Sequence, residues 1–196
     1  MRRESITAIV LCGGSGERLG AADKTLAPLA DRPLIQYALE ALRPQVGALV
    51  LGCGRDPGAY ASFGYPLASD ETPGSGPLGG IVGALSLVRT EWILIYPGDA
   101  PFPDATLVER LAATAEREGL AVPVAGGYRQ HLVLLLRRAR AAALAGFYAE
   151  GGRAIREWLD AAGASVVDMD DLADAFFNVN TPEDLARAER RLATRG

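Results

Sequence analysis

The sequence predicts an α/β fold in which a mostly parallel sheet is flanked by helices. Short apolar runs of strand length alternate with apolar residues at helical spacing along the chain, a pattern typical of parallel strand–helix units. Of the 196 residues, 49% are hydrophobic and 22% are charged, which is the composition of a globular protein. No linker, repeat or low-complexity tract interrupts the pattern, so we expect one domain over residues 1–196.

The predicted strands are short runs of apolar, often β-branched residues. The first, over residues 6–11, is continuously apolar and ends at glycines, as buried parallel strands do. Further strands are expected over residues 46–51, 65–68, 92–96, 120–124, 132–136 and 165–167.

The predicted helices lie between these strands. One opens at Pro33, which suits a first helical turn, and continues with apolar residues at helical spacing to Leu42. Others are expected over residues 78–88, 105–117, 137–148, 153–159 and 181–192. Ligands of such sheets bind beyond the carboxyl ends of the strands. Functional residues are therefore expected in the loops that follow the first four strands.

Charge and composition exclude several classes of function. The net charge is −4, whereas a nucleic-acid-binding surface would need a basic patch. No apolar run approaches the length needed to span a bilayer, and the N-terminus does not resemble a signal peptide, so we expect a cytoplasmic protein. Cys12 and Cys53 make neither a disulfide framework nor a zinc site.

The loop after the first strand has the features of a phosphate-binding loop. Gly13 and Gly14 let the backbone approach an anion closely, and Arg18 and Lys24 add positive charge. It is not a Walker loop, because Lys24 follows an aspartate rather than a glycine, and it lacks the third glycine of the dinucleotide fingerprint. Lys24 is the only lysine in the chain, against 19 arginines. A lysine is a compact point charge that fits a confined phosphate site.

Carboxylates follow two other strands. Asp99 comes directly after the strand over residues 92–96 and stands between prolines, where it could hold Mg²⁺ against phosphate oxygens. Asp70 has the same topological place after the third strand. Transfer to a phosphate acceptor needs mainly positioning and electrostatics, so the single histidine, His131, is expected to be structural or to contact the acceptor.

These motifs, taken in order, resemble the molybdenum cofactor guanylyltransferase family over nearly the whole chain. The matching segments are residues 11–20, 23–24, 33–34, 76–80, 97–101 and 178–185. The resemblance implies a Rossmann-like nucleotidyltransferase fold. It also implies a reaction that joins GMP from GTP to the phosphate of molybdopterin and releases pyrophosphate.

The resemblance also assigns site residues. It implies that GTP lies on the first loop, on Lys24, on Asp70 and on Asp99, and that Mg²⁺ lies on Asp99. With the residue-level reading, the expected nucleotide-binding set is Leu11, Cys12, Gly13, Gly14, Lys24, Asp70 and Asp99. The expected catalytic groups are Lys24, Arg18 and Asp99.

The segment Asn178–Leu185 has two readings. Asn180 or Thr181 can cap the last helix, and Pro182 suits its first turn. In related nucleotidyltransferases an asparagine in this place helps to hold the metal, so Asn180 is the second expected metal ligand beside Asp99.

Other members of the fold remain alternatives. A cytidylyltransferase tends to carry alanine where Gly13 stands, and sugar-phosphate nucleotidyltransferases usually show Pro-Lys in place of Asp23-Lys24. A non-catalytic GTP-binding protein is a third alternative, although Lys24 and Asp99 are both present. The substrates expected are GTP and molybdopterin, and this function allows transient contact with proteins that make or receive the cofactor.

Overall fold

The computed structural model describes residues 1–14, 16–21, 23–54, 56–69 and 76–194, and it contains one large mixed sheet. The sheet has eight strands in the order β10-β7-β9-β6-β1-β4-β5, with β8 paired to β7. Its strands are β1 (Ile6–Leu11), β4 (Ala48–Cys53), β5 (Leu67–Ser69), β6 (Trp92–Pro97), β7 (Leu120–Ala125), β8 (Tyr128–Arg129), β9 (Leu134–Arg137) and β10 (Ser165–Asp168). The pairs along this order are parallel except those that β9 makes with β6 and β7. The predicted α/β fold with a mostly parallel sheet is therefore confirmed.

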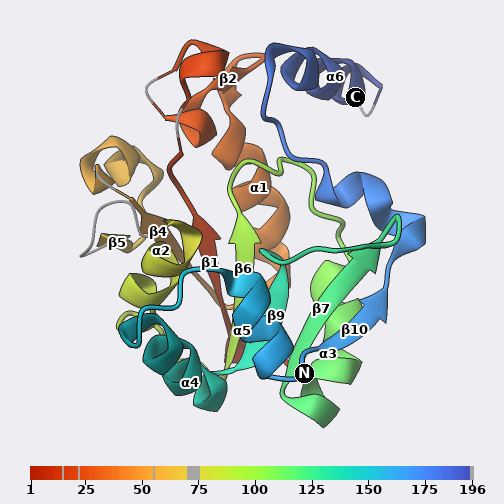
Figure 1. Ribbon diagram of the computed structural model, residues 1–196. Helices are drawn as coiled ribbons and strands as arrows, with labels where there is room; N and C mark the ends of the chain where they lie inside the picture. The colour runs from red at the N-terminus through yellow and green to blue at the C-terminus, as the bar shows by residue number, and fades with distance from the viewer. Residues whose placement is uncertain (15, 22, 55, 70–75, 195–196) are drawn as a thin grey trace.

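Helices cover both faces of this sheet (Figure 1). The helices are α1 (Leu34–Leu42), α2 (Gly76–Leu85), α3 (Leu107–Glu118), α4 (Arg138–Ala149), α5 (Ile155–Ala161) and α6 (Pro182–Ala193). Apolar residues of α1 and α3 belong to one buried cluster, and those of α2, α4 and α5 belong to another. None of the described helices has the length and apolarity needed to cross a membrane.

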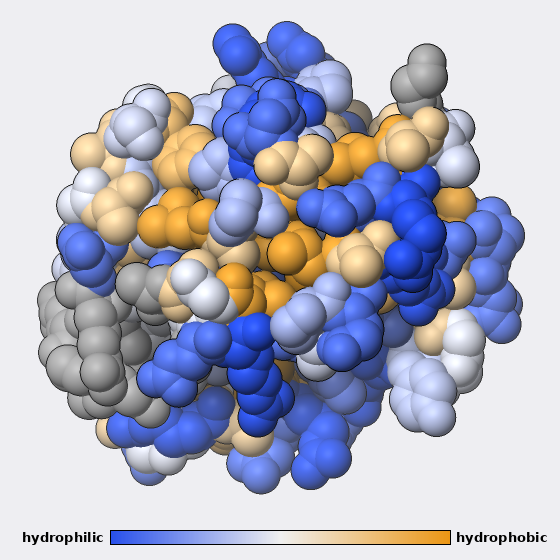
Figure 2. Space-filling model, turned by 90° about the horizontal axis from the view of Figure 1, so that it is seen from above, coloured by the Kyte–Doolittle hydropathy of each residue, from blue (hydrophilic) through white to orange (hydrophobic). Residues whose placement is uncertain are grey.

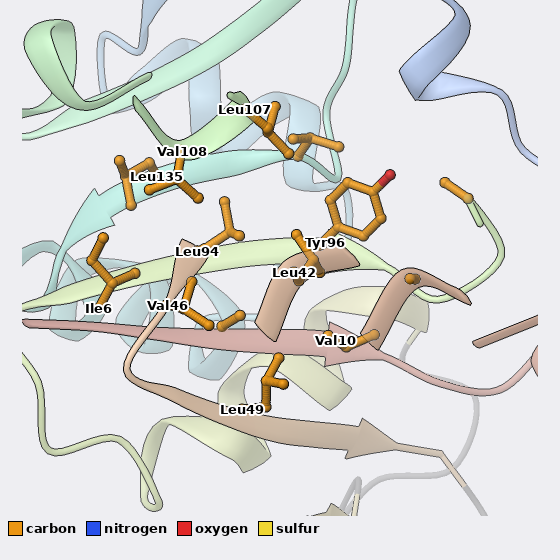
Figure 3. Packing of buried hydrophobic residues seen from close by; sticks show 14 of the residues in the cluster. Ile6, Val10, Leu42, Val46, Leu49, Leu94, Tyr96, Leu107, Val108 and Leu135 are labelled. Carbon is orange, nitrogen blue, oxygen red and sulfur yellow. The ribbon is translucent and has the colours of Figure 1, made fainter. Parts of the chain in front are cut away.

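Strand β1 contributes side chains to both clusters because they alternate between the two faces of the sheet. Ile6, Ala8 and Val10 join the cluster under α1 and α3, whereas Ile9 and Leu11 join the other. Every residue of β1 is buried, which explains why all of its residues but Thr7 are apolar rather than alternating with polar ones. Figure 3 shows the first cluster, in which Tyr96 and Leu94 of β6 lie near Leu42 of α1 and Leu107 of α3.

A third, smaller cluster joins the C-terminal helix to the early part of the chain. The two-stranded hairpin of β2 (Pro28–Leu29) and β3 (Arg32–Pro33) lies beside α6, away from the large sheet (Figure 1). Leu29, Leu34 and Tyr37 pack there with Val179 and Ala188. This cluster fixes the start of α6 near the loop that follows β1.

The structure differs from the predictions mainly in its shortest elements. The long loop expected between residues 12 and 32 contains two 3₁₀ helices, Glu17–Leu19 and Lys24–Leu26, and the first strand of the hairpin. The strands β2, β3 and β8 have only two residues each, too few to show a hydrophobic period. The strand expected over residues 46–51 is Ala48–Cys53, because a 3₁₀ turn over Arg43–Gln45 lengthens the preceding connection.

Two helical glycines differ in what surrounds them, and this generates a stability prediction. A Cβ at Gly83 of α2 would lie 2.5 Å from the backbone oxygen of Ser69 in β5, whereas a Cβ at Gly146 of α4 would have nothing within 4 Å. Gly83→Ala should therefore lower the free energy of unfolding by about 1–3 kcal/mol, because the helix must move away from the strand. Gly146→Ala should raise the same free energy by about 0.5–1 kcal/mol, because alanine favours the helix.

Urea denaturation of the two variants beside the unmodified protein measures both effects. Glycine-to-alanine substitution should thus change the free energy of unfolding in opposite directions in the two helices. If Gly83→Ala is as stabilising as Gly146→Ala, the close approach of α2 to β5 is wrong.

Candidate functional site

A cavity of about 740 Å³ lies where β1, β4 and β6 end. Its walls come from the loops after these three strands and from the start of α2; they include Leu11, Cys12, Gly13, Gly14, Asp23, Gly52, Gly54, Gly76, Pro77, Pro97 and Asp99. Figure 2 views the molecule from above and shows apolar surface near the middle of the view, bordered by hydrophilic side chains. The cavity has the place that ligand sites occupy in open parallel sheets.

The glycine loop lines this cavity with backbone in a conformation that other residues rarely adopt. Gly13 and Gly14 have φ angles of 99° and 118°. A side chain at either position would strain the loop, so glycine is required for this path. Leu11, Cys12, Gly13 and Gly14, which are four of the expected nucleotide-binding residues, all line the cavity.

The thiol of Cys12 has no sign of reactivity. Burial raises the pKa of this thiol well above its ordinary value, and the neighbouring Cys53 thiol raises it further. The Cys12 sulfur donates to the Val10 carbonyl oxygen at 3.4 Å. The Cys12 thiol is therefore kept in its protonated form.

The chain after the glycines turns back toward them. Asp23 caps the short 3₁₀ helix Lys24–Leu26, because its Oδ1 accepts the Thr25 N–H at 2.9 Å. The Lys24 N–H in turn donates to the Gly14 carbonyl oxygen at 3.2 Å. This fold places the Lys24 side chain beside the end of β6.

The Lys24 ammonium donates to two oxygen atoms from distant parts of the chain. One is Oδ2 of Asp99 and the other is Oδ1 of Asn180. The side chains of Lys24 and Asp99 are only 14% and 20% exposed, so this ion pair is largely shielded from water. A backbone hydrogen bond of 2.9 Å from Val179 N–H to the Asp99 carbonyl oxygen holds the two segments together. Three of the expected site residues thus meet at one point.

The start of α6 separates the two readings of its motif. Thr181, not Asn180, caps the helix: its hydroxyl accepts the Asp184 N–H at 3.1 Å, and Asp184 Oδ2 accepts the Thr181 N–H at 3.0 Å. This reciprocal pair is a capping box. Because the cap is made by Thr181, the Asn180 amide oxygen is directed to Lys24 instead.

A second cavity of about 290 Å³ adjoins the first, and Pro97 and Leu132 line both. Its polar walls come from Arg129, Gln130, His131 and Asn178. Burial lowers the pKa of His131, and the positive charges of Arg129 and Arg156 lower it further. His131 is therefore biased toward its neutral form by its burial and by the positively charged side chains near it.

One expected residue, Arg18, does not join this arrangement in the described part of the chain. Arg18 is exposed on the 3₁₀ helix Glu17–Leu19, and the cavity wall as described does not include it. Asp70 lies outside the described residues.

Two residues that no motif predicted contact the glycine loop. The Gly13 N–H donates to the hydroxyl of Tyr60 at 3.2 Å, and that hydroxyl is 2.6 Å from the Thr25 hydroxyl. Tyr60 comes from the 3₁₀ helix Pro57–Phe63, which follows β4. A sequence signal for Thr25 exists, since Asp-x-Thr suits a side-chain-capped turn, but Tyr60 stands in no recognisable pattern.

Comparison with known proteins gives one consistent family. Residues 8–166 match the model of the MobA-like NTP transferase domain. A molybdenum cofactor guanylyltransferase of Shewanella loihica is 37% identical over 191 residues, which covers 96% of this chain and 97% of that protein. The protein of the same name from Serratia proteamaculans is 40% identical over 186 residues and covers 94% of both chains.

Solved structures agree with this result. Molybdopterin-guanine dinucleotide biosynthesis protein A of Archaeoglobus fulgidus superimposes with a TM-score of 0.77 at 27% identity, covering 96% of this chain and 99% of that one. The 2-C-methyl-D-erythritol 4-phosphate cytidylyltransferase of Thermus thermophilus has a TM-score of 0.71 at 21% identity, covering 94% and 98%, and so shares the fold. The family model and the closely similar relatives together show that the chain belongs to the MobA-like NTP transferase family.

Proposed function

We propose that this protein is a Mg²⁺-dependent guanylyltransferase that transfers GMP from GTP to the phosphate of molybdopterin and releases pyrophosphate. The observation that supports this most directly is the meeting of Lys24, Asp99 and Asn180 at the end of β6, beside a glycine loop. A cation between two oxygen acceptors, next to a glycine loop that lines the cavity, suits a triphosphate and its metal. The names of the relatives at 37% and 40% identity supply the identity of the substrates.

The reaction exchanges one phosphoanhydride bond for another. An oxygen of the acceptor phosphate forms a bond to the α-phosphorus of GTP, and the bond from that phosphorus to the β-phosphate oxygen breaks, so that pyrophosphate leaves with the electron pair. The acceptor phosphate is already anionic near neutral pH, so no residue needs to remove a proton. The protein must instead position the two substrates and offset negative charge.

Lys24 is suited to the electrostatic part of this task. Its ammonium is the charge nearest to Asp99 in the described structure, and it is mostly shielded from water, where a fixed charge acts more strongly than in bulk solvent. We propose that it turns from Asp99 toward the triphosphate when GTP binds. The glycine loop would then hold the rest of the nucleotide through its backbone, and the smaller cavity with Gln130, His131 and Asn178 would take the acceptor.

The two residues that accept hydrogen bonds from Lys24 fit a magnesium ion. Asp99 and Asn180 offer a carboxylate and an amide oxygen that already face one cation, and Mg²⁺ prefers oxygen ligands. No three acidic, histidine or cysteine side chains converge on a point within the described ranges. The remaining ligands would therefore be phosphate oxygens and water, as is usual for Mg²⁺ in phosphate-transfer sites. When bound there, the ion neutralises charge on the phosphate oxygens.

The first prediction concerns the substrate and Lys24. Among the four nucleoside triphosphates, with Mg²⁺ and molybdopterin, GTP should give the fastest release of pyrophosphate. Lys24→Ala should lower turnover on the order of a hundredfold or more, because a preorganised charge is lost from the site. Lys24→Arg should also be impaired, because the planar guanidinium is larger. Arg117→Ala, which removes a charge at the exposed end of α3, is the control and should leave turnover unchanged.

Two outcomes would contradict the proposal in different ways. Faster reaction with CTP would make the protein a cytidylyltransferase of the same fold. Near-normal turnover of Lys24→Ala with GTP would remove the ammonium from the mechanism.

The second prediction separates Asn180 from its neighbour. Thr181→Ala should lower the free energy of unfolding by about 1 kcal/mol through loss of the cap, and should keep the turnover measured at saturating Mg²⁺. Asn180→Ser should lower turnover and leave the free energy of unfolding unchanged, because the amide oxygen that accepts from Lys24 is lost while the cap remains. Turnover against Mg²⁺ concentration, with thermal unfolding of each variant, measures both effects. Full activity of Asn180→Ser at limiting Mg²⁺ would leave this residue without a part in the site.

The third prediction concerns the competition between Lys24 and the metal. Without nucleotide, the ammonium stands between the two oxygens that the ion needs. Lys24→Met should therefore bind Mn²⁺ more tightly than the unmodified protein when GTP is absent, on the order of tenfold, because a like charge at close range is removed. The concentration of free Mn²⁺ can be followed by electron paramagnetic resonance. Arg117→Ala carries the same change of net charge and should bind Mn²⁺ unchanged; equal or weaker binding by Lys24→Met would overturn the assignment.

A further inference from the structure

A chain of hydrogen bonds ties the glycine loop to Tyr60, Thr25 and Asp23, of which Thr25 and Asp23 also line the cavity. The Gly13 N–H contacts the Tyr60 hydroxyl at 3.2 Å, and this hydroxyl lies 2.6 Å from that of Thr25. The Thr25 hydroxyl donates to Asp23 Oδ1 at 3.0 Å. The chain therefore links the two ends of the loop, from Gly13 to the residue before Lys24.

The chemistry of the end groups fixes the direction of this chain. An N–H can only donate, and an ionised carboxylate can only accept. Since the Thr25 hydroxyl gives its single hydrogen to Asp23, Tyr60 must donate to Thr25, and its oxygen is then free to accept from Gly13. Each hydroxyl thus donates once and accepts at least once.

Both hydroxyl-bearing residues are buried. Tyr60 is 1% exposed and Thr25 is 2% exposed, so little of either side chain is open to water. Burial raises the pKa of Tyr60 far above its ordinary value, so the phenol stays protonated and remains a donor at every working pH. The ring is held by the cluster under α1 and by Phe63, whose centroid is 6.2 Å away.

We propose that Tyr60 is a positioning residue that sets the nucleotide affinity of the glycine loop. It acts through Gly13 and Thr25 rather than by touching the nucleotide, and it connects the loop after β4 to the loop after β1. The proposal rests on the proposed function only in taking GTP as the ligand of the loop.

The physical consequence follows from the conformational freedom of the two glycines in the loop. Gly13 and Gly14 both have positive φ angles, and glycine has the greatest conformational freedom of any residue. Without an anchor, the loop would therefore populate other conformations. The apparent affinity falls in proportion to the fraction of molecules that keep the binding conformation.

The test is the affinity for GTP of variants that remove one hydroxyl at a time. Tyr60→Phe and Thr25→Val should each weaken GTP binding roughly tenfold, because a smaller fraction of the molecules then keeps the loop in its binding conformation. Thr25→Ser keeps the hydroxyl and should restore most of the affinity. The double variant Tyr60→Phe/Thr25→Val should lose little more than either single variant, because both interrupt one chain.

Tyr37→Phe is the matched control. Tyr37 is also a buried tyrosine, but its hydroxyl donates to the Leu29 carbonyl oxygen at 2.9 Å in the third cluster and takes no part in the hydrogen bonds to Gly13 and Thr25. Loss of the Tyr37 hydroxyl should lower the stability by about as much as loss of the Tyr60 hydroxyl does, and it should leave the affinity for GTP unchanged. Isothermal titration calorimetry measures affinity, and thermal unfolding measures stability. The turnover of Tyr60→Phe at saturating GTP should stay within about twofold of the unmodified protein while KM rises, because the anchor acts on nucleotide binding.

The possible results distinguish this inference from the proposed function. If the unmodified protein does not bind GTP, the proposed function fails. If it binds GTP and Tyr60→Phe binds equally well, or if Tyr37→Phe weakens binding as much, the positioning role of Tyr60 is wrong.

Discussion

The loops that form the cavity leave the sheet side by side because β1 pairs in parallel with β4 on one side and with β6 on the other. The ladder continues past the strand ends: Cys12 N–H donates to the Gly52 carbonyl oxygen at 2.9 Å, and Gly98 N–H donates to that of Leu11 at 2.8 Å. Neighbouring strands are about 4.8 Å apart, so residues that follow the three strands are brought within reach of one another. Asp99 can meet a lysine from the first loop only because of this arrangement.

The group formed by Lys24, Asp99 and Asn180 shows how a site can be preorganised before its substrates arrive. An ammonium between a carboxylate and an amide oxygen satisfies both acceptors in a partly buried place, where an unpaired charge would be costly. The same oxygens suit a divalent ion, and the same ammonium suits a phosphate. Binding of a metal–triphosphate complex would therefore exchange partners among groups that are already in position, and little charge would be left unpaired during the exchange.

Much of the fold could be predicted from the sequence because its main elements are long and strongly patterned. The buried strand at residues 6–11 and the helix that ends at Leu42 have unambiguous apolar patterns. The hairpin of β2 and β3 has two residues in each strand and could not be predicted by period. The direction of β9 was likewise hidden, since an antiparallel strand that is buried on both faces is as apolar as a parallel one.

The site was predictable in its residue types but not in its contacts. Lys24, Asp99 and Asn180 stood out by their composition and place, yet only the fold brings positions so far apart in the sequence to one point. The choice between Asn180 and Thr181 as the cap depended on side-chain geometry that a sequence does not contain. Tyr60 gave no signal, because its role comes from the packing of a 3₁₀ helix against a loop more than 30 residues earlier in the chain, as the separations of 47 and 35 residues show.

The smallest of the three apolar clusters holds the C-terminal helix, and the position of Asn180 depends on that helix. Asn180 stands at the entrance to α6, and this helix is held by the third cluster through Val179 and Ala188 rather than by the large sheet. Regions with few buried apolar contacts open at lower free energy than the core of a protein. If α6 detached, Asn180 would leave the site while the sheet stayed intact. Mild heating should therefore abolish turnover at a temperature where the circular dichroism spectrum is still that of a folded protein.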